Sequence, residues 1–305
     1  MPAEHSWQIS EPQKIEFTEP VTELHVRAVN GTVNVVGTDD PATRLEIGAV
    51  EGPPLLVTRE GGKLVVAYED LPWKGFLKWL DRKGWRRTVE VSVSVPAQAS
   101  LTVGVVGASA VVSGMRGRTD VRGVSGDSTL VGLTGPVHAE TVSGAVEAQR
   151  LTGPLRFNSV SGDLTFIDGG SHVRADTVSG SVVLDVGPEA PRETDIKLTT
   201  VSGEVAIRLP EDADAAVEAR TTSGGLSSAF PGLRTDGQWG VRQAHGTLGA
   251  GRGRLRAETV SGGLALLKRP KEEPPGPDVR PSGAEGDTPD APAAPSPAPS
   301  APKDL

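Results

Sequence analysis

The 305-residue chain contains no cysteine and few aromatic residues, with five Trp, five Phe and one Tyr. The lack of cysteine excludes a disulfide framework, a zinc site with cysteine ligands and a cysteine nucleophile. It also fits a reducing compartment. Because aromatic rings are so scarce, we expect any core to be filled mainly by aliphatic side chains.

Long apolar runs are missing as well. No stretch of about 18 apolar residues occurs, and residues 1–17 lack a basic start followed by an apolar segment. We therefore expect a cytoplasmic protein without a transmembrane segment. The net charge of -8 argues against general binding of nucleic acid, which depends on concentrated Lys and Arg. Any basic site must be local.

Glycine and proline are abundant, and proline is unevenly distributed. Residues 268–305 carry 11 of the 25 prolines and almost no large apolar side chains, so this segment cannot offset the entropy cost of folding. We expect a flexible segment at 1–19, a folded domain at 20–267 with an insertion at 70–87, and a disordered tail at 268–305.

An internal repeat dominates the folded domain. The tripeptide Val-Ser-Gly recurs, mostly every 18 residues, beginning at Val124, Val142, Val160, Val178, Val201 and Val260. Thr222-Ser223-Gly224 is a close copy, and degenerate copies are expected at 106 and 244, so that coils follow one another in sequence order. Leu-Thr-Gly-Pro at 133 and 151 stands halfway between copies, which halves the period to nine.

Each nonamer is expected to be one strand and one corner. Positions one, five and seven of the nonamers from Val124 are mostly apolar and share one face of a strand, because side chains alternate with a period of two. A single nonamer cannot bury that face, so successive units must stack in parallel about 4.8 Å apart. The sequence predicts an all-β solenoid with coils of about 18 residues.

Residues 24–96 contain less regular alternating segments, which predict an irregular N-terminal β cap on the same domain. The repeat does not fit the two related architectures with known signatures. The hexapeptide register contains prolines at 136 and 154. Calcium-binding nonapeptide rolls need Gly-Gly-x-Gly-x-Asp in each unit, whereas the residue after the glycine varies here. We expect no bound metal and no cofactor.

No catalytic constellation accompanies the repeat. The repeated serines have no partner base, which a nucleophile requires, so we expect their hydroxyls to bond the backbone at corners. The outward column His138, Arg156 and Arg174 forms either an anion-binding stripe or a solvated face with ion pairs to its neighbours. The sequence therefore predicts a protein that is not an enzyme.

The insertion interleaves basic and aromatic side chains. Its candidate contact residues are Trp73, Lys74, Phe76, Lys78, Trp79, Arg82, Lys83, Trp85, Arg86 and Arg87. Trp together with Arg and Lys suits the headgroup zone of an anionic membrane, and it also suits a protein or surface partner. The alternative is a loop whose Trp and Leu cover one edge of the solenoid while its cations stay solvated.

The segments Ala-Glu-Thr-Val-Ser-Gly-Ala-Val (139–146) and Ala-Asp-Thr-Val-Ser-Gly-Ser-Val (175–182) resemble the bacterial putative-adhesin family of β-strand-repeat domains, a family of unknown function. The resemblance covers roughly residues 20–267. It implies a right-handed, single-stranded β-helix, and it transfers no catalytic residues. The adhesin label also implies a surface location, which the lack of an export signal does not support.

The leading hypothesis is a non-enzymatic β-solenoid scaffold or adhesin-like binding protein of unknown ligand. One alternative is a carbohydrate-active β-helix enzyme, for which the acidic turns at 188–194 and 211–215 are the candidates, because glycosidic chemistry needs paired carboxylates. Another is a scaffold that associates with a membrane surface. The third is self-association through the solenoid ends, whose strand edges are open to pairing.

Overall fold

The structure is a computed structural model that describes residues 4–68, 87–238 and 240–270. These residues form 26 β-strands in two sheets, sheet A with 14 strands and sheet B with 12. No α-helix occurs among them, and hence no helix that would be long and apolar enough to cross a membrane. The all-β prediction is confirmed.

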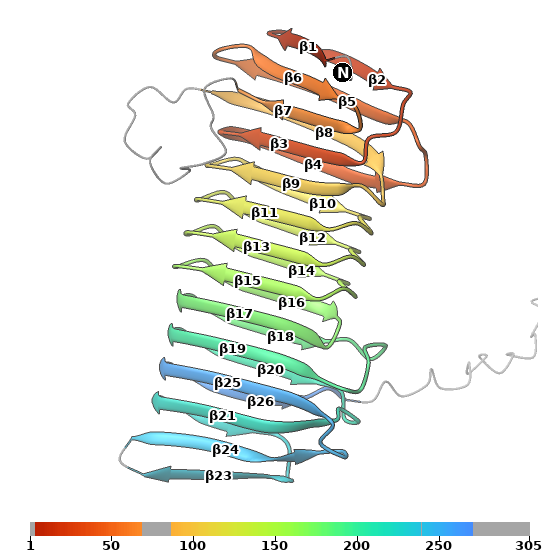
Figure 1. Ribbon diagram of the computed structural model, residues 1–305. Helices are drawn as coiled ribbons and strands as arrows, with labels where there is room; N and C mark the ends of the chain where they lie inside the picture. Colours follow the sequence, from red (N-terminus) through yellow and green to blue (C-terminus); the bar gives the residue numbers. More distant parts are fainter. Residues whose placement is uncertain (1–3, 69–86, 239, 271–305) are drawn as a thin grey trace, which may run out of the picture. The chain divides into compact units, whose positions relative to one another are not determined.

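Six consecutive coils form the middle of the folded unit (Figure 1). Each coil places one strand in sheet A and the next in sheet B, and the chain advances along the axis in the right-handed sense. In sheet A these strands are β9 (Ser100–Val105), β11 (Thr119–Gly123), β13 (Val137–Thr141), β15 (Leu155–Ser159), β17 (His172–Ser179) and β19 (Asp195–Ser202). In sheet B they are β10 (Ser109–Ser113), β12 (Ser128–Val131), β14 (Val146–Gln149), β16 (Leu164–Gly169), β18 (Val182–Val186) and β20 (Val205–Leu209).

The strand register reproduces the sequence repeat. Val137 pairs with Leu155, which pairs with Val173, so parallel neighbours are 18 residues apart. Between β17 and β19 the interval grows, because Val173 pairs with Ile196. The extra residues lie in the turn that follows β18. The longer sequence interval of this repeat predicts such a small loop insertion.

The core is a single column of apolar side chains between the two sheets. The seventh nonamer position is at most 1% exposed at Leu130, Ala139, Ala148, Phe157, Phe166, Ala175 and Leu184. Each large ring has a small neighbour in register, because Phe157 lies between Ala139 and Ala175. Gly169 interrupts the repeat for a related reason, since a Cβ there would lie 2.0 Å from the ring of Phe166.

The first nonamer position does not point inward throughout, which corrects the prediction. Leu133 and Leu151 are fully buried, whereas Val160 and Val178 are each 52% exposed. At the Val-Ser-Gly corner the strand alternation simply continues, so that the residue before the valine faces inward. Ser159 is buried there, and its Oγ accepts a hydrogen bond from the Gly162 backbone N–H at 2.7 Å.

The glycine of the Val-Ser-Gly corner is required by the stacking of coils. A Cβ on Gly144 would lie 2.1 Å from the carbonyl oxygen of Gly126 in the preceding coil, far inside van der Waals contact. Gly126 is equally close to the carbonyl of Ala108. Side chains are therefore excluded from this column, whatever the backbone angles allow.

The last coils do not follow the order of the sequence. The final coil, β25 (Gly253–Ser261) and β26 (Leu264–Lys268), lies between the β19–β20 coil and the coil of β21 (Ala215–Ser223) and β22 (Leu226–Ser228). The expected coil at 244 is not one: β23 (Leu233–Gln238) and β24 (Val241–Leu248) form an antiparallel hairpin on β21. The prediction that all coils stack in sequence order is wrong at this end (Figure 1).

The N-terminal part is an irregular β cap, as expected. The coil of β3 (Glu23–Ala28) and β4 (Asn30–Thr38) stacks in parallel on β9 and β10. Beyond it lie β7 (Lys63–Ala67) and β8 (Thr88–Pro96), and then antiparallel β6 (Leu55–Glu60) and β5 (Thr43–Glu51). β1 (Glu4–Ile9) and β2 (Gln13–Phe17) pair with β6 and β5. Residues 4–17, expected to be flexible, thus contribute two paired strands.

Candidate ligand-binding groove

A groove of about 600 Å³ runs along the outer face of sheet A, across β13, β15, β17 and β19. We call it the basic groove. Its lining residues are Arg118, Pro136, Val137, His138, Pro154, Leu155, Arg156, His172, Val173, Arg174, Asp195 and Lys197. Four of them are Arg or Lys and one is acidic, in a chain whose net charge is -8.

The cations of the basic groove form a ladder because the coils stack in register. His138 pairs with Arg156, Arg156 with Arg174, and Arg174 with Lys197 on four adjacent parallel strands. Neighbouring strands are about 4.8 Å apart, so the positive side chains of Arg156, Arg174 and Lys197 repeat at that spacing along the solenoid axis, next to the imidazole of His138. The ladder is the outward column that follows the first core residue of each strand.

The members of this ladder differ in their partners. Nε of Arg174 lies 3.3 Å from Oδ2 of Asp176, on the same strand. Arg156 and Lys197 are exposed, and among the described residues no carboxylate lies within ion-pair distance of either. These two cations are therefore available to an anionic ligand.

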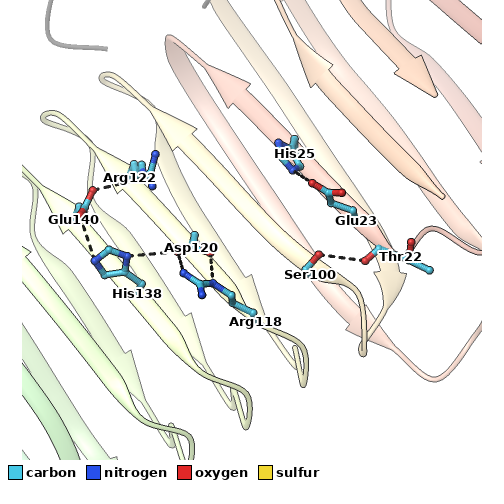
Figure 2. A network of polar contacts seen from close by, with 9 residues as sticks. All are labelled: Thr22, Glu23, His25, Ser100, Arg118, Asp120, Arg122, His138 and Glu140. Atoms are coloured by element: carbon cyan, nitrogen blue, oxygen red, sulfur yellow. Dashed lines mark hydrogen bonds and ion pairs between the residues drawn. The ribbon is translucent and has the colours of Figure 1, made fainter. Parts of the chain in front are cut away.

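A network of charges closes the end of the basic groove at β11 and β13 (Figure 2). Nε of Arg118 lies 2.7 Å from Oδ2 of Asp120, whose other oxygen is 3.4 Å from Nδ1 of His138. Nε2 of His138 lies 3.2 Å from Glu140, which also meets Arg122 at 3.5 Å. The hydrogen bond from Arg118 lowers the pKa of Asp120 despite its partial burial, so the carboxylate stays charged.

This network does not have the arrangement of a hydrolytic site. Both ring nitrogens of His138 face carboxylates, and Nε2 also meets the Asn158 amide at 3.1 Å. A histidine that activates a nucleophile must face a hydroxyl or thiol, and the described contacts of His138 include neither. The contacts hold the imidazole against the sheet.

The repeated serines contact the backbone, as predicted. Oγ atoms of Ser125, Ser143 and Ser161 donate hydrogen bonds of 3.1 Å to backbone carbonyls of the preceding coil, at Val106, Val124 and Val142 respectively. The serine column thus serves the corner, and its hydroxyls have no neighbouring base in these hydrogen bonds.

Of the two acidic turns that an enzyme could use, the one at 211–215 has its carboxylates engaged in ion pairs. Asp212 lies 3.0 Å from Arg192, and Asp214 lies 2.7 Å from Arg252. Hydrogen bonds from the Arg252 backbone and side chain lower the pKa of Asp214. A general acid in glycoside hydrolysis needs a raised pKa instead. The described residues also hold no cluster of three His, Asp or Glu suited to a metal ion.

Nine of the ten candidate contact residues of the insertion, those from Trp73 to Arg86, lie outside the described residues. Arg87 is described: its guanidinium lies 5.3 Å from the centroid of the Tyr68 ring, and its carbonyl accepts a hydrogen bond from the Asn30 backbone N–H at 3.2 Å. The insertion starts after β7 and ends before β8, within the N-terminal cap.

Sequence analysis found His138, Arg156 and Arg174 of the basic groove but missed Lys197. The step from β17 to β19 is 23 residues, which hides the next member from a count of 18. A signal was nevertheless present, because each of Arg156, Arg174 and Lys197 stands four residues before the valine of a Val-Ser-Gly corner.

Comparison with known proteins agrees with a β-solenoid of unknown function. Residues 170–267 match the family model described as Toastrack DUF4097, a domain of unknown function. A crystal structure of a putative cell adhesion protein from Clostridium sporogenes is similar over 85% of this chain and 100% of its own, with 10% identity and a TM-score of 0.26. That TM-score supports no argument from the neighbour. No curated protein matches the chain.

Proposed function

We propose that this protein is a non-enzymatic, adhesin-like β-solenoid scaffold that binds an anionic ligand in the basic groove. The observation that carries the proposal is the cation ladder on the outer face of sheet A, in which Arg156 and Lys197 have no carboxylate partner among the described residues. Arg in particular offers paired donors that match carboxylate or phosphate oxygens.

Binding fits this surface better than catalysis. An active site brings a nucleophile, a base and an electrostatic stabiliser to one point. Here equivalent side chains are repeated at equal intervals along the axis, and the carboxylates of Glu211, Asp212 and Asp214 in the turn at 211–215 are paired with cations. Such an arrangement repeats one kind of side chain along the surface and does not bring different catalytic groups together at one point.

Binding of citrate, measured by isothermal titration calorimetry at low salt, tests the proposal. We expect saturable binding that weakens as salt is added, and a loss of about tenfold or more in the double variant Arg156→Gln/Lys197→Gln. Arg234→Gln is the control, because Arg234 is exposed on β23, outside the groove. Equal affinity of the double variant and the wild type would contradict the proposal. Hydrolysis of a polysaccharide or ester that one Asp or Glu substitution abolishes would also contradict it.

A second proposal concerns the insertion and an anionic membrane. Residues 71–87 carry three Trp and six Lys or Arg against a single acid, a composition that suits the interfacial zone of a bilayer. Co-sedimentation with vesicles containing phosphatidylserine tests this, with the variant Trp73→Ala/Trp79→Ala/Trp85→Ala as the comparison. We expect the wild type to pellet and the variant to stay in solution. Equal pelleting, or none from either, would dismiss membrane contact.

The cytoplasmic location and self-association through the solenoid ends stay predictions. At the ends of sheet A, β1 and β23 are the edge strands, and such edges offer backbone groups to a second chain. Light scattering against protein concentration distinguishes a polymer from a monomer.

A further inference from the structure

We propose that the ligand of the basic groove is an extended acidic polysaccharide that lies along the solenoid axis. This inference rests on the function proposed above, and it specifies the chemistry and shape of the ligand.

The first argument is the repeat of charge. From Arg156 to Lys197 the charged members of the ladder span two strand spacings, or about 10 Å, and His138 adds a third spacing. A small anion would contact one or two of these side chains and leave the rest unused. A polymer with one carboxylate on each sugar presents charge at intervals comparable to the ladder and meets Arg156, Arg174 and Lys197 in turn.

Apolar proline rings lie beside the cation ladder. Pro136 and Pro154 are exposed at the starts of β13 and β15, one residue before the buried Val137 and Leu155. Their rings give the groove an apolar border next to its cations. The two faces of a pyranose ring expose C–H groups while its edge carries hydroxyls and the carboxylate, so an acidic sugar chain matches both features.

The composition of the groove lining also favours an acidic polysaccharide over nucleic acid. Proteins that bind single strands stack bases on Phe, Tyr or Trp. The described lining of the groove contains none of these residues, and its only aromatic rings are the imidazoles of His138 and His172. Phosphate contacts alone would rely on dense positive charge, and the groove has just four Arg or Lys.

Acidic side chains set the length of the site. At one end Asp120 continues the ladder column next to His138, and its lowered pKa keeps it negatively charged. At the other end the next member, Arg256, lies 2.7 Å from Glu258, and the acidic Glu218 follows it in the ladder column. An anionic chain is thus favoured between these points, a length of about three or four sugars at the ladder spacing.

Oligogalacturonates of one to eight sugars, titrated by calorimetry into the full chain at low salt, test the inference. We expect affinity to rise with length up to about four sugars and then level off, since the next member of the ladder, Arg256, is paired with Glu258. The double variant Arg156→Gln/Lys197→Gln should bind the tetramer at least about tenfold more weakly. Arg234→Gln should bind as the wild type does, and neutral dextran oligomers should not bind. Matching circular dichroism spectra and melting temperatures will verify that the variants are folded.

The outcomes separate this inference from the proposed function. If citrate binds and the double variant loses it, but affinity for galacturonate does not depend on length, the polysaccharide inference is wrong and the anion site stands. Tighter binding of single-stranded DNA or polyphosphate at matched charge would also overturn it. If no anion binds, both proposals fail.

Discussion

A left-handed residue directs the inward leucine at the corners that follow β12 and β14. Gly132 has φ 64° and Arg150 has φ 51°, and each is followed by a fully buried leucine. The left-handed residue breaks the alternation of the strand and so turns the next side chain inward. At the Val-Ser-Gly corner no left-handed residue precedes Val160, so the strand alternation continues and the side chain of Val160 faces solvent.

This difference predicts unequal effects of substitutions at two positions that the sequence repeat treats as equivalent. Leu151→Ala should lower the free energy of unfolding by about 2–5 kcal/mol, because it opens a cavity in a closed core. Val160→Thr should change it by less than about 0.5 kcal/mol, because the side chain is half exposed. Urea unfolding at equilibrium measures both. Similar losses from the two substitutions would show that the valine column also faces the core.

The buried carboxylate of Asp185 predicts a pH dependence of stability. Burial raises its pKa, but hydrogen bonds from Arg208 and Arg269 outweigh burial and hold the pKa below its ordinary value of 3.8. In the unfolded chain the group takes up a proton at higher pH than in the folded chain. The stabilisation is therefore present above about pH 4 and is lost as the pH falls below that value.

Asp185→Asn should accordingly lower the free energy of unfolding by about 2–3 kcal/mol at pH 7, and by less at pH 3. Urea unfolding at the two pH values measures the change. Asp195→Asn is the matched control, because Asp195 is exposed and should show little effect at either pH. A loss that is equal at pH 7 and pH 3 would mean that the charge of Asp185 does not stabilise the fold.

At the scale of elements, the C-terminal coil completes the stack out of order. β25 and β26 occupy a place between two coils that precede them in the sequence, so β21 and β22 contact the solenoid through the last strands of the domain. Arg269 follows β26 and lies 2.6 Å from Asp185. The end of the domain is thereby tied to the β18 strand.

This order predicts how a defect in the last coil spreads. Leu266→Ala, in β26, should raise hydrogen–deuterium exchange in both flanking strands of sheet B, β20 and β22, because each pairs with β26. Mass spectrometry of peptides from 205–209 and 226–228 measures it. A rise confined to 241–252, the preceding segment in the sequence, would contradict the coil order.

The central coils were predictable from sequence and the end coils were not. Between 100 and 184 the strands follow a local rule, because a parallel coil pairs with the next coil 18 residues later. Either β21 or β25 could stack on β19. The outcome depends on how well each coil packs against the β19–β20 coil, which the local sequence does not reveal. Both carry the same Ser-Gly corner, so the repeat could not distinguish them.

The direction of the corner side chains could not be predicted from the sequence, for a related reason. Val160 and Leu151 both occupy position one of a nonamer, and a period of two predicts the same face for both. Only the backbone angle at Arg150 separates them. Arginine rarely adopts a left-handed conformation, so its presence in the sequence does not predict one.

At the scale of the folded unit, stacking converts a sequence repeat into a surface repeat. One outward residue per coil becomes a line of like side chains, and the basic groove is the place where that line is cationic. Sequence analysis predicted the column at 138, 156 and 174 and left open whether it binds anions or is a solvated face. The groove favours binding, as do Arg156 and Lys197, which have no carboxylate partner in the part of the chain that the structure describes.

Arginine labelling with phenylglyoxal, read by mass spectrometry with and without a galacturonate tetramer, tests this account most directly. The account predicts that the tetramer slows modification of Arg156 and Arg174, while Arg234 on β23 reacts at an unchanged rate. Modification of Arg156 at the same rate in both conditions, or protection confined to Arg82, Arg86 and Arg87, would contradict the basic groove as the binding surface.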